Sequence, residues 1–271
     1  MAEFHVFAAG NATADQPVIR RIGVQDIWDA LREGGQDFMA RPSHYAFVVI
    51  IYPIIGFAMV KWAAGNNSLQ MLFPLVTGFA LIGPFAAIGL YEISRRLEQK
   101  RDTSWRHAFN VRKSPAIPAI VAIGIMLLGV FILWLYAAQA IYTSLYGPNP
   151  PAELMPFFYD VLGTARGWTL IILGGAVGFA FALFVLCTTA IAFPLLLDRD
   201  AGATTAVRTS IKAAWINPVP MLLWGMIVAG GLFLGALPGL AGLIVVLPVL
   251  GHATWHVYRK MVEAPKQRRD A

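Results

Sequence analysis

The stretch Ala213–Tyr258, AAWINPVPMLLWGMIVAGGLFLGALPGLAGLIVVLPVLGHATWHVY, contains no Asp, Glu, Lys or Arg over its 46 residues. A helix that crosses the hydrocarbon layer of a bilayer, roughly 30 Å thick, needs about 20 mostly apolar residues. The stretch is too long for one such helix, and Pro238-Gly239 divides it into two near-equal halves because this pair favours a turn. We therefore predict two membrane-spanning helices joined by a tight turn.

Four further runs lack these charged residues in the same way. They are Pro42–Val60, Leu69–Tyr91, Ser114–Ala152 and Gly167–Leu197. Only 13% of the 271 residues are charged, against about 25% in soluble domains, which excludes a soluble chain. The runs predict an all-α polytopic membrane protein with six transmembrane helices, and Pro194 should kink or end the fourth. The single Cys187 excludes a disulfide framework.

The basic residues gather on alternate sides of these spans. The N-terminal segment, the loops after the second and fourth spans and the C-terminal tail hold 19 of the 21 Lys and Arg residues, and the other loops hold Lys61 and Arg166. Loops rich in Lys and Arg stay cytoplasmic, so we expect a multi-pass protein of the bacterial inner membrane with both termini in the cytoplasm. The net charge of +6 then indicates contact with anionic lipid and not with nucleic acid.

Nine basic residues adjoin the predicted spans and are candidate contacts for anionic lipid headgroups. They are Arg95, Arg96, Arg112, Lys113, Arg199, Arg208, Lys212, Arg259 and Lys260. Gly174 with Gly178 and Gly231 with Gly235 form two GxxxG spacings, which let helices approach closely within the chain or between two copies. The expected partners are membrane lipids, another membrane protein complex or a second copy, and no cofactor is expected.

Short segments with apolar residues at helical spacing precede the first, third and fifth spans. They surround Trp28, Trp105 and Trp215, and charged residues stand among the apolar ones, as in an amphipathic helix. We predict three repeats, at about 24–92, 103–197 and 201–258, each a cytoplasmic interfacial helix followed by a two-span hairpin. The basic linkers of any inner-membrane protein would look similar, and that alternative stays open. Residues 1–17 are expected to form a disordered N-terminus, residues 18–262 a single transmembrane domain and residues 263–271 a basic tail.

Two motifs carry a resemblance to a known family. They are Phe193-Pro194-Leu195-Leu196-Leu197-Asp198-Arg199-Asp200 and Leu247-Pro248-Val249-Leu250-Gly251-His252-Ala253-Thr254-Trp255-His256. From about Val18 to Val262 the chain resembles a family of predicted bacterial integral membrane proteins catalogued only as a domain of unknown function. The resemblance implies a membrane location and a helical fold, but no activity and no catalytic residue. Some such proteins are labelled cytochrome oxidase subunits, and this chain lacks the many intramembrane histidines that such a subunit needs.

His252 and His256 are the sharpest candidates for chemistry. Residues i and i+4 share one face of a helix, so the two imidazoles could ligate one metal or haem, or relay protons. Trp255 and Tyr258 beside them are typical of an aromatic belt at a membrane surface. A structural or interfacial role is therefore the favoured interpretation.

Two acidic residues lie at the ends of predicted spans. Glu92 ends the second span, and Arg95 and Arg96 follow at i+3 and i+4, where both can pair with it. An ionisable group at membrane depth is alternatively a functional site, but we favour the ion pair. Asp198 follows the fourth span, and its carboxylate or that of Asp200 is expected to cap the helix that begins near Thr204.

The sequence holds no nucleotide-binding loop, nucleophile elbow or zinc motif. No Asp, Glu, Lys or Arg lies near the centre of a predicted span, which counts against an ion-coupled transporter. We expect a non-enzymatic scaffold, an assembly factor or an organiser of lipid at the cytoplasmic leaflet. One alternative is a channel or transporter for a small solute, with the pathway between the repeats. A third is an enzyme or haem protein that uses His252 and His256.

Overall fold

A computed structural model describes residues 17–40, 54, 56, 58–59, 61–63, 65, 68–103, 114–151, 153–199, 201–238 and 240–264 of the chain. Within these residues the chain is helical and forms no strand, and one antiparallel bridge joins Ile19 to Val262. The all-α class predicted from the apolar runs is therefore confirmed for the described part of the chain.

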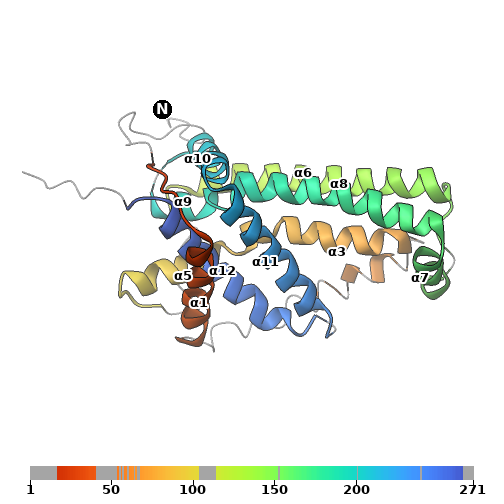
Figure 1. Ribbon diagram of the computed structural model, residues 1–271, viewed down its shortest axis with the longest axis horizontal. Helices are drawn as coiled ribbons and strands as arrows, with labels where there is room; N and C mark the ends of the chain where they lie inside the picture. The colour runs from red at the N-terminus through yellow and green to blue at the C-terminus, as the bar shows by residue number, and fades with distance from the viewer. Residues whose placement is uncertain are drawn as a thin grey trace, which may run out of the picture. The chain divides into compact units, whose positions relative to one another are not determined.

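Twelve helical elements follow one another along the described residues (Figure 1). They are α1 (Val24–Ala40), η2 (Leu69–Met71), α3 (Leu72–Leu81), α4 (Gly83–Ala86), α5 (Ile88–Glu98), α6 (Ile117–Tyr146), α7 (Leu154–Gly163), α8 (Ala165–Thr189), α9 (Ala192–Asp198), α10 (Ala203–Ile216), α11 (Pro218–Ala236) and α12 (Leu243–Met261). Two compact units result: unit 1 is Met1–Val49, Pro84–Gly124 and Leu186–Ala271, and unit 2 is Ile50–Gly83 and Ile125–Val185. Both α6 and α8 contribute to the two units.

Among the residues that the structure describes, three helical segments are long and apolar enough to cross a membrane. They are Ile117–Tyr146, Ala165–Asp198, which runs through α8 and α9, and Pro218–Ala236. Large apolar side chains on them are exposed in the isolated chain: Ile125 keeps 66% of its surface and Ile172 keeps 68%. Extensive apolar exposure marks a surface for lipid or protein. The third, fourth and fifth predicted spans thus have suitable helices, and the chain has the features of a polytopic membrane protein.

The other three predicted spans are not among these helices. Most of the first, Pro42–Val60, lies outside the described residues. The second is divided among η2, α3, α4 and α5. Pro84 explains the break between α3 and α4, because it has no N–H to donate to the carbonyl of Ala80. α12 has a spanning length, but its last turns carry two histidines and two basic residues. These three spans stay predictions.

Pro194 interrupts the fourth predicted span. α8 ends at Thr189 and α9 begins at Ala192, because Pro194 cannot donate to a carbonyl in the preceding turn. The N–H of Ile191 at this break donates instead to Ser210 Oγ of α10, at 3.2 Å. A buried N–H without a partner costs about 1–3 kcal/mol. Ser210 therefore stabilises the break and ties α10 to it.

In unit 1, α1 packs along α12 (Figure 1). Gly34 makes the approach close, since a Cβ added there would lie 2.7 Å from Ala253 Cα. Ile27 and Ala30 of α1 are fully buried, and Trp255 of α12 keeps only 1% of its surface. Burying an Ile side chain contributes about 1.5–3 kcal/mol. Apolar packing therefore holds the two helices together and brings their polar residues into contact.

α11 and α12 form a tight antiparallel pair. α11 ends at Ala236 and α12 begins at Leu243, so the predicted turn at Pro238-Gly239 lies between them. Gly231 and Gly235 let α12 approach: a Cβ on either would lie 3.3 or 3.1 Å from the side chain of Val246. This GxxxG spacing therefore serves packing within the chain.

Trp134 of α6 is the central side chain of unit 2 and keeps 4% of its surface. Its Nε1 donates to the carbonyl of Pro74 at 2.9 Å, and its ring lies 5.7 Å from the ring of Phe181. Gly178 leaves room for this ring, since a Cβ there would lie 3.1 Å away, whereas a Cβ at Gly174 would meet nothing within 4 Å. Gly178 thus packs inside unit 2, and self-association through Gly174 stays a prediction.

Candidate functional site

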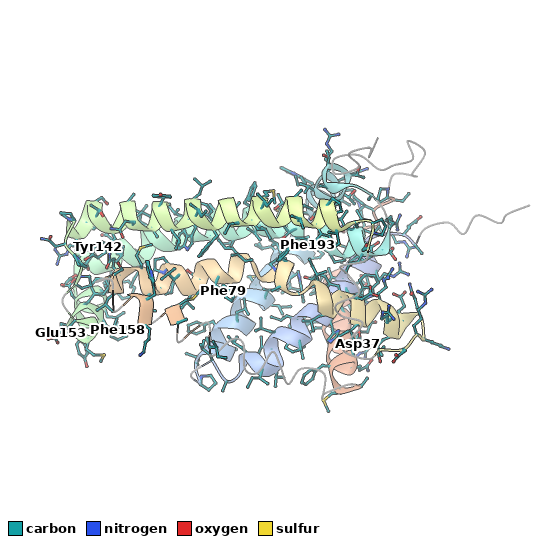
Figure 2. All side chains as sticks on the ribbon, turned by 180° about the vertical axis from the view of Figure 1, so that it is seen from behind. Asp37, Phe79, Tyr142, Glu153, Phe158 and Phe193 are labelled. Atoms are coloured by element: carbon teal, nitrogen blue, oxygen red, sulfur yellow. The ribbon has the colours of Figure 1, made fainter. Side chains whose placement is uncertain are left out.

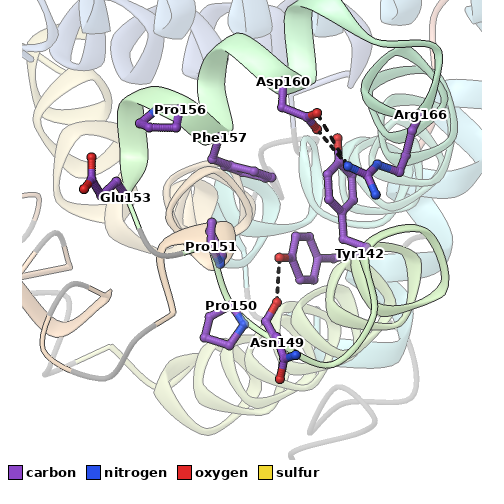
Figure 3. Close-up of a pocket in the computed structure, with 10 residues that line it drawn as sticks. Tyr142, Asn149, Pro150, Pro151, Glu153, Pro156, Phe157, Asp160 and Arg166 are labelled. Carbon is purple, nitrogen blue, oxygen red and sulfur yellow. Dashed lines mark hydrogen bonds and ion pairs between the residues drawn. The ribbon is translucent and has the colours of Figure 1, made fainter.

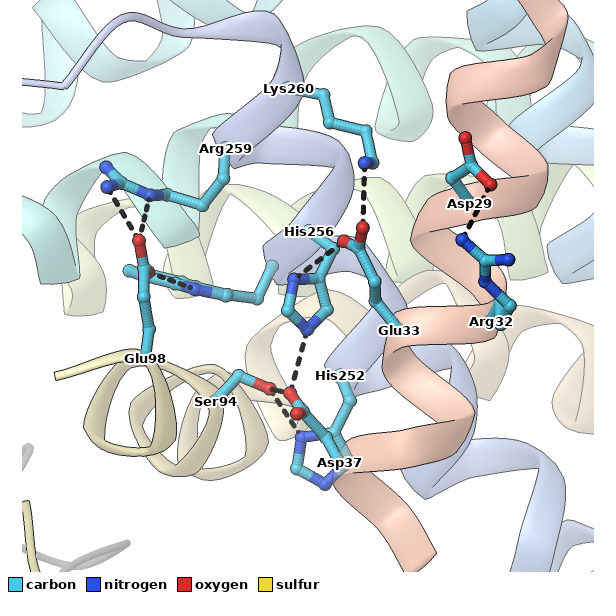
Figure 4. A network of polar contacts seen from close by, with 11 residues as sticks. Asp29, Arg32, Glu33, Asp37, Ser94, Glu98, His252, His256, Arg259 and Lys260 are labelled. Atoms are coloured by element: carbon cyan, nitrogen blue, oxygen red, sulfur yellow. Dashed lines mark hydrogen bonds and ion pairs between the residues drawn. The ribbon is translucent and has the colours of Figure 1, made fainter. Parts of the chain in front are cut away.

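Polar side chains from α1, α5 and α12 meet in unit 1, and we call them the polar cluster (Figure 4). They are Glu33, Asp37, Ser94, His252, His256 and Lys260. The two residues of α1 lie four apart, and the three residues of α12 repeat at the same interval, so each set lines one face of its helix. Because α1 and α12 pack together along these faces, the carboxylates and the imidazoles are brought within hydrogen-bonding reach.

The contacts of the polar cluster form one continuous chain. His256 lies between the carboxylates of α1, with Nε2 at 2.8 Å from Asp37 Oδ2 and Nδ1 at 3.2 Å from Glu33 Oε2. Lys260 Nζ donates to the other oxygen of Glu33 at 3.0 Å. Ser94 Oγ lies 2.6 Å from Asp37 Oδ2 and 2.7 Å from Nδ1 of His252, whose side chain is fully buried. Polar contacts therefore run without a gap from the partly exposed Lys260 to a buried imidazole.

A second set of contacts joins the ends of α5, α9 and α12. Glu98 accepts hydrogen bonds from Arg259 at 2.8 Å and from Trp255 Nε1 at 3.1 Å. The Tyr258 hydroxyl donates to Asp198 at 2.6 Å. Burial works to lower the pKa of Arg259, but the carboxylates of Glu98 and Asp198 raise it above its ordinary value. The guanidinium stays charged and links α12 to both neighbours.

Glu92 is a buried carboxylate of α5 with 3% of its surface exposed. Arg95 Nε donates to it at 2.8 Å and Arg96 Nε at 2.7 Å, so the predicted ion pairs are present. Arg95 also donates to the carbonyl of Leu197 at 3.0 Å, and Arg96 to that of Asp102 at 3.2 Å. The pairs satisfy the carboxylate and fasten α5 to α9.

The cap predicted for Asp198 is wrong. α10 begins at Ala203 with Gly202 as its N-cap, and no described side chain caps it, while Asp200 lies outside the described residues. Asp198 is the last residue of α9, where the Tyr258 hydroxyl and the Arg259 guanidinium of α12 reach it at 2.6 and 3.5 Å. Tertiary partners thus take the carboxylate that the local pattern assigned to the next helix.

The nine basic residues predicted to contact lipid differ in whether they have partners within the chain. Five have partners within the chain: Arg95, Arg96, Arg199, Arg259 and Lys260. Arg112 and Lys113 lie outside the described residues. Arg208 and Lys212 are exposed on α10 and form no ion pair with another described residue. Of the candidate lipid contacts that the structure describes, these last two are therefore the most open to an external partner.

The acidic half of the polar cluster was not predicted from the sequence. Glu33 and Asp37 belong to a segment predicted only as an interfacial helix, and Ser94 was not a candidate. The available signal was spacing, since the two carboxylates stand four residues apart like His252 and His256. Spacing alone does not say which two helices pack together, so the partners could not be assigned.

The predicted metal or haem role of His252 and His256 finds no further ligand. Within the described ranges, no group of three or more His, Cys, Asp or Glu side chains is placed to hold a metal ion. The two imidazoles share one face of α12, but they meet different partners, Ser94 for the first and the α1 carboxylates for the second. The metal role stays a prediction.

Unit 2 contains a pocket of about 460 Å³ beside α6, α7 and the start of α8 (Figure 3). The rings of Tyr142 and Tyr146 stack in its wall at 5.3 Å, and Phe157 packs edge-on against both. The Arg166 guanidinium lies 4.2 Å from the Tyr146 ring centre and 3.5 Å from Asp160. Figure 2 shows Tyr142, Glu153 and Phe158 together at this end of unit 2. The wall of the pocket is thus aromatic, and the Arg166 guanidinium is already paired with Tyr146 and Asp160.

Residues 72–198 match the family described as a predicted integral membrane protein (DUF2189). The match runs from the start of α3 to the end of α9, and it confirms the predicted resemblance for this part of the chain. The motif at 247–256 lies outside the matched residues. No curated protein and no solved structure matches the chain. The domain has no known function, so the activity is inferred from the geometry.

Proposed function

We propose that the protein is a non-enzymatic membrane scaffold that organises anionic lipid at the cytoplasmic leaflet. The observation that carries this proposal is the basic face of α10, made of Arg208, Lys212 and Trp215. The three residues stand at i, i+4 and i+7, so they share one side of the helix. Trp215 keeps 81% of its surface. A basic and aromatic face whose cations form no ion pair with another described residue suits a membrane surface.

The position of α10 in the chain supports the same conclusion. Only Asn217 separates it from α11, one of the three helices long and apolar enough to cross a membrane. α10 therefore ends where that span would begin, at the depth of the lipid headgroups. Trp rings favour this depth. Each Lys or Arg near an anionic surface contributes about 1 kcal/mol of attraction.

Asn217 holds the junction of α10 and α11 in a fixed geometry. Its side chain accepts a hydrogen bond from the N–H of Ile22 at 2.8 Å and donates to the carbonyl of Arg20 at 3.0 Å. Ala206 and Ala213 are fully buried on the opposite side of α10. The helix therefore cannot turn its basic face inward without losing these contacts.

The proposal includes an orientation. We place the basic face, the polar cluster and both termini on the cytoplasmic side of a bacterial inner membrane, because Lys and Arg favour that side. The ion pairs of α12 with α1, α5 and α9 then form the framework that supports α10. In this arrangement the buried charges serve assembly of the bundle and not transport of a solute.

The test compares the full chain in nanodiscs of neutral lipid with the same chain in nanodiscs that contain phosphatidylglycerol. We expect anionic lipid to raise the Tm of the wild-type chain. The double variant Arg208→Gln/Lys212→Gln should lose most of this increase in Tm. The lost attraction to lipid amounts to about 2 kcal/mol, since each charge contributes about 1 kcal/mol. Its Tm in neutral lipid should match that of the wild type, since both side chains are exposed.

The matched control is Arg20→Gln/Arg32→Gln, which removes the same charge from two exposed side chains that pair with Glu263 and Asp29. It should keep the lipid-dependent increase in Tm. An equal loss in the control would show that net charge alone acts, and an unchanged increase in the α10 variant would refute the basic face as the lipid site.

A further inference from the structure

We propose that the polar cluster is a proton-binding site, and that it holds α1 on α12 while one additional proton sits on His256. The inference is independent of lipid binding by the basic face. The observation that supports it is the number of hydrogen atoms that the hydrogen bonds of the polar cluster require. The ligand of this site is the proton itself.

His256 lies between two hydrogen-bond acceptors. A carboxylate only accepts hydrogen bonds, and a neutral imidazole has one N–H and one bare nitrogen. Both ring nitrogens face carboxylate oxygens, Asp37 at 2.8 Å and Glu33 at 3.2 Å. With both acids ionised, a neutral ring would set a nitrogen lone pair against an oxygen lone pair. A second ring proton removes this conflict, because each nitrogen then donates to its own carboxylate.

The Ser94 hydroxyl has a single hydrogen to donate. Asp37 Oδ2 lies within reach of both Ser94 Oγ, at 2.6 Å, and His256 Nε2, so it accepts from both. Ser94 Oγ must then accept from Nδ1–H of His252, at 2.7 Å. His252 can make this contact as a neutral ring, which agrees with its complete burial. The additional proton is therefore placed at His256 and not deeper in the unit.

The charges around His256 balance when the proton is bound. Glu33 and Asp37 are the acids that face it from α1, and Lys260 is the base beside it on α12. With a protonated ring the four charges sum to zero. Loss of the proton leaves one excess negative charge between two packed helices, where the His256 and Asp37 side chains are only 18% and 17% exposed. An uncompensated charge at such a place is far more costly than one in water.

The other elements that pack on this site do not change the balance. α5 places the uncharged Ser94 against it, and the nearby Glu98 is paired with Arg259. Asp198 of α9 is held by Arg259 and by the Tyr258 hydroxyl. α11 carries no titratable side chain. The proton on His256 is thus the variable charge of the contact between α1 and α12.

The first measurement is amide hydrogen exchange of the full chain in neutral nanodiscs, from about pH 6 to about pH 9, with the intrinsic rates divided out. The packed form binds more protons than the opened form, so rising pH favours opening of α1. We expect opening to increase by up to about tenfold per pH unit above about pH 6.5, where an unpaired imidazole releases its proton. α10 should show no such increase.

Two substitutions distinguish an effect of the proton on His256 from an effect of side-chain packing between α1 and α12. Glu33→Gln supplies an amide N–H to the bare nitrogen of a neutral His256, so α1 should stay packed and its opening should no longer depend on pH. His256→Gln cannot take up the proton, so α1 should open readily even at about pH 6. The control Arg32→Gln removes a charge of α1 that pairs with Asp29 outside the cluster. It should keep the wild-type profile.

The second measurement reads the proton directly by ¹⁵N NMR of the histidine rings in the wild-type chain. We expect two protonated nitrogens on His256 and a single protonated Nδ1 on His252 at neutral pH. A singly protonated His256 ring in the packed protein would overturn the proposal. So would a flat opening profile of wild-type α1, or a Glu33→Gln profile with the wild-type dependence on pH.

Discussion

α10 and α12 carry the same kinds of basic residue and use them differently. On α10 the basic residues are Arg208 and Lys212, which form no ion pair with a described residue. On α12 they are Arg259 and Lys260, which meet carboxylates of α5 and α1 at 2.8 and 3.0 Å. A basic residue beside an apolar run thus marks a side of the membrane, but acids on neighbouring helices decide whether it is free for lipid.

The largest effect is expected where charge is buried and paired. Glu92→Ala leaves Arg95 and Arg96 without their carboxylate, and these side chains are only 23% and 16% exposed. Removing one partner of a buried pair costs about 3–5 kcal/mol, and the partial exposure places this loss near about 3 kcal/mol. The free energy of unfolding, measured by denaturant titration in detergent, checks this value. Glu153→Ala, an exposed acid without an ion pair among described residues, is the control.

The close packing of α1 on α12 can be tested with two adjacent glycines. Gly34→Ala places a methyl group against the backbone of Ala253, whereas a Cβ at Gly35 would meet nothing within 4 Å. We expect the first change to lower the free energy of unfolding by about 1–3 kcal/mol. The second should be neutral or should stabilise the helix by up to about 1 kcal/mol. Equal effects at both positions would contradict the packing described for α1.

The hydrogen bond from the break between α8 and α9 to Ser210 gives a further test on α10. Ser210→Ala removes the acceptor of the Ile191 N–H, and a buried donor without a partner costs about 1–2 kcal/mol. Thr204→Ala on the exposed side of the same helix should change stability by less than about 0.5 kcal/mol. Thermal unfolding of both variants in neutral lipid measures the difference. A stable Ser210→Ala variant would mean that the break does not depend on this bond.

Local sequence patterns predicted those parts of the structure that local physics decides. Apolar runs predicted the helices α6, α8 and α11, because length and hydrophobicity suffice to mark a spanning helix. The pairs of Glu92 with Arg95 and Arg96 followed from their spacing within one helix. The interruption near Pro194 followed from its missing N–H.

The contacts between distant helices could not be predicted in this way. Asp37 and His256 are 219 residues apart, and nothing in either segment identifies the other as its partner. Asp198 was assigned to the next helix along the chain, whereas Tyr258 takes its carboxylate from 60 residues away. Such pairs depend on which helices pack together, and packing between helices is decided by the whole bundle.

The most direct test of the account removes equal charge from α10 and from α12. Arg208→Gln/Lys212→Gln and Arg259→Gln/Lys260→Gln are compared for phosphatidylglycerol affinity, measured by native mass spectrometry, and for the free energy of unfolding in neutral lipid. The account predicts that the α10 variant loses lipid affinity and keeps its stability, while the α12 variant keeps lipid affinity and loses stability. Equal losses of lipid affinity in both variants, or an α10 variant that retains its lipid, would contradict it.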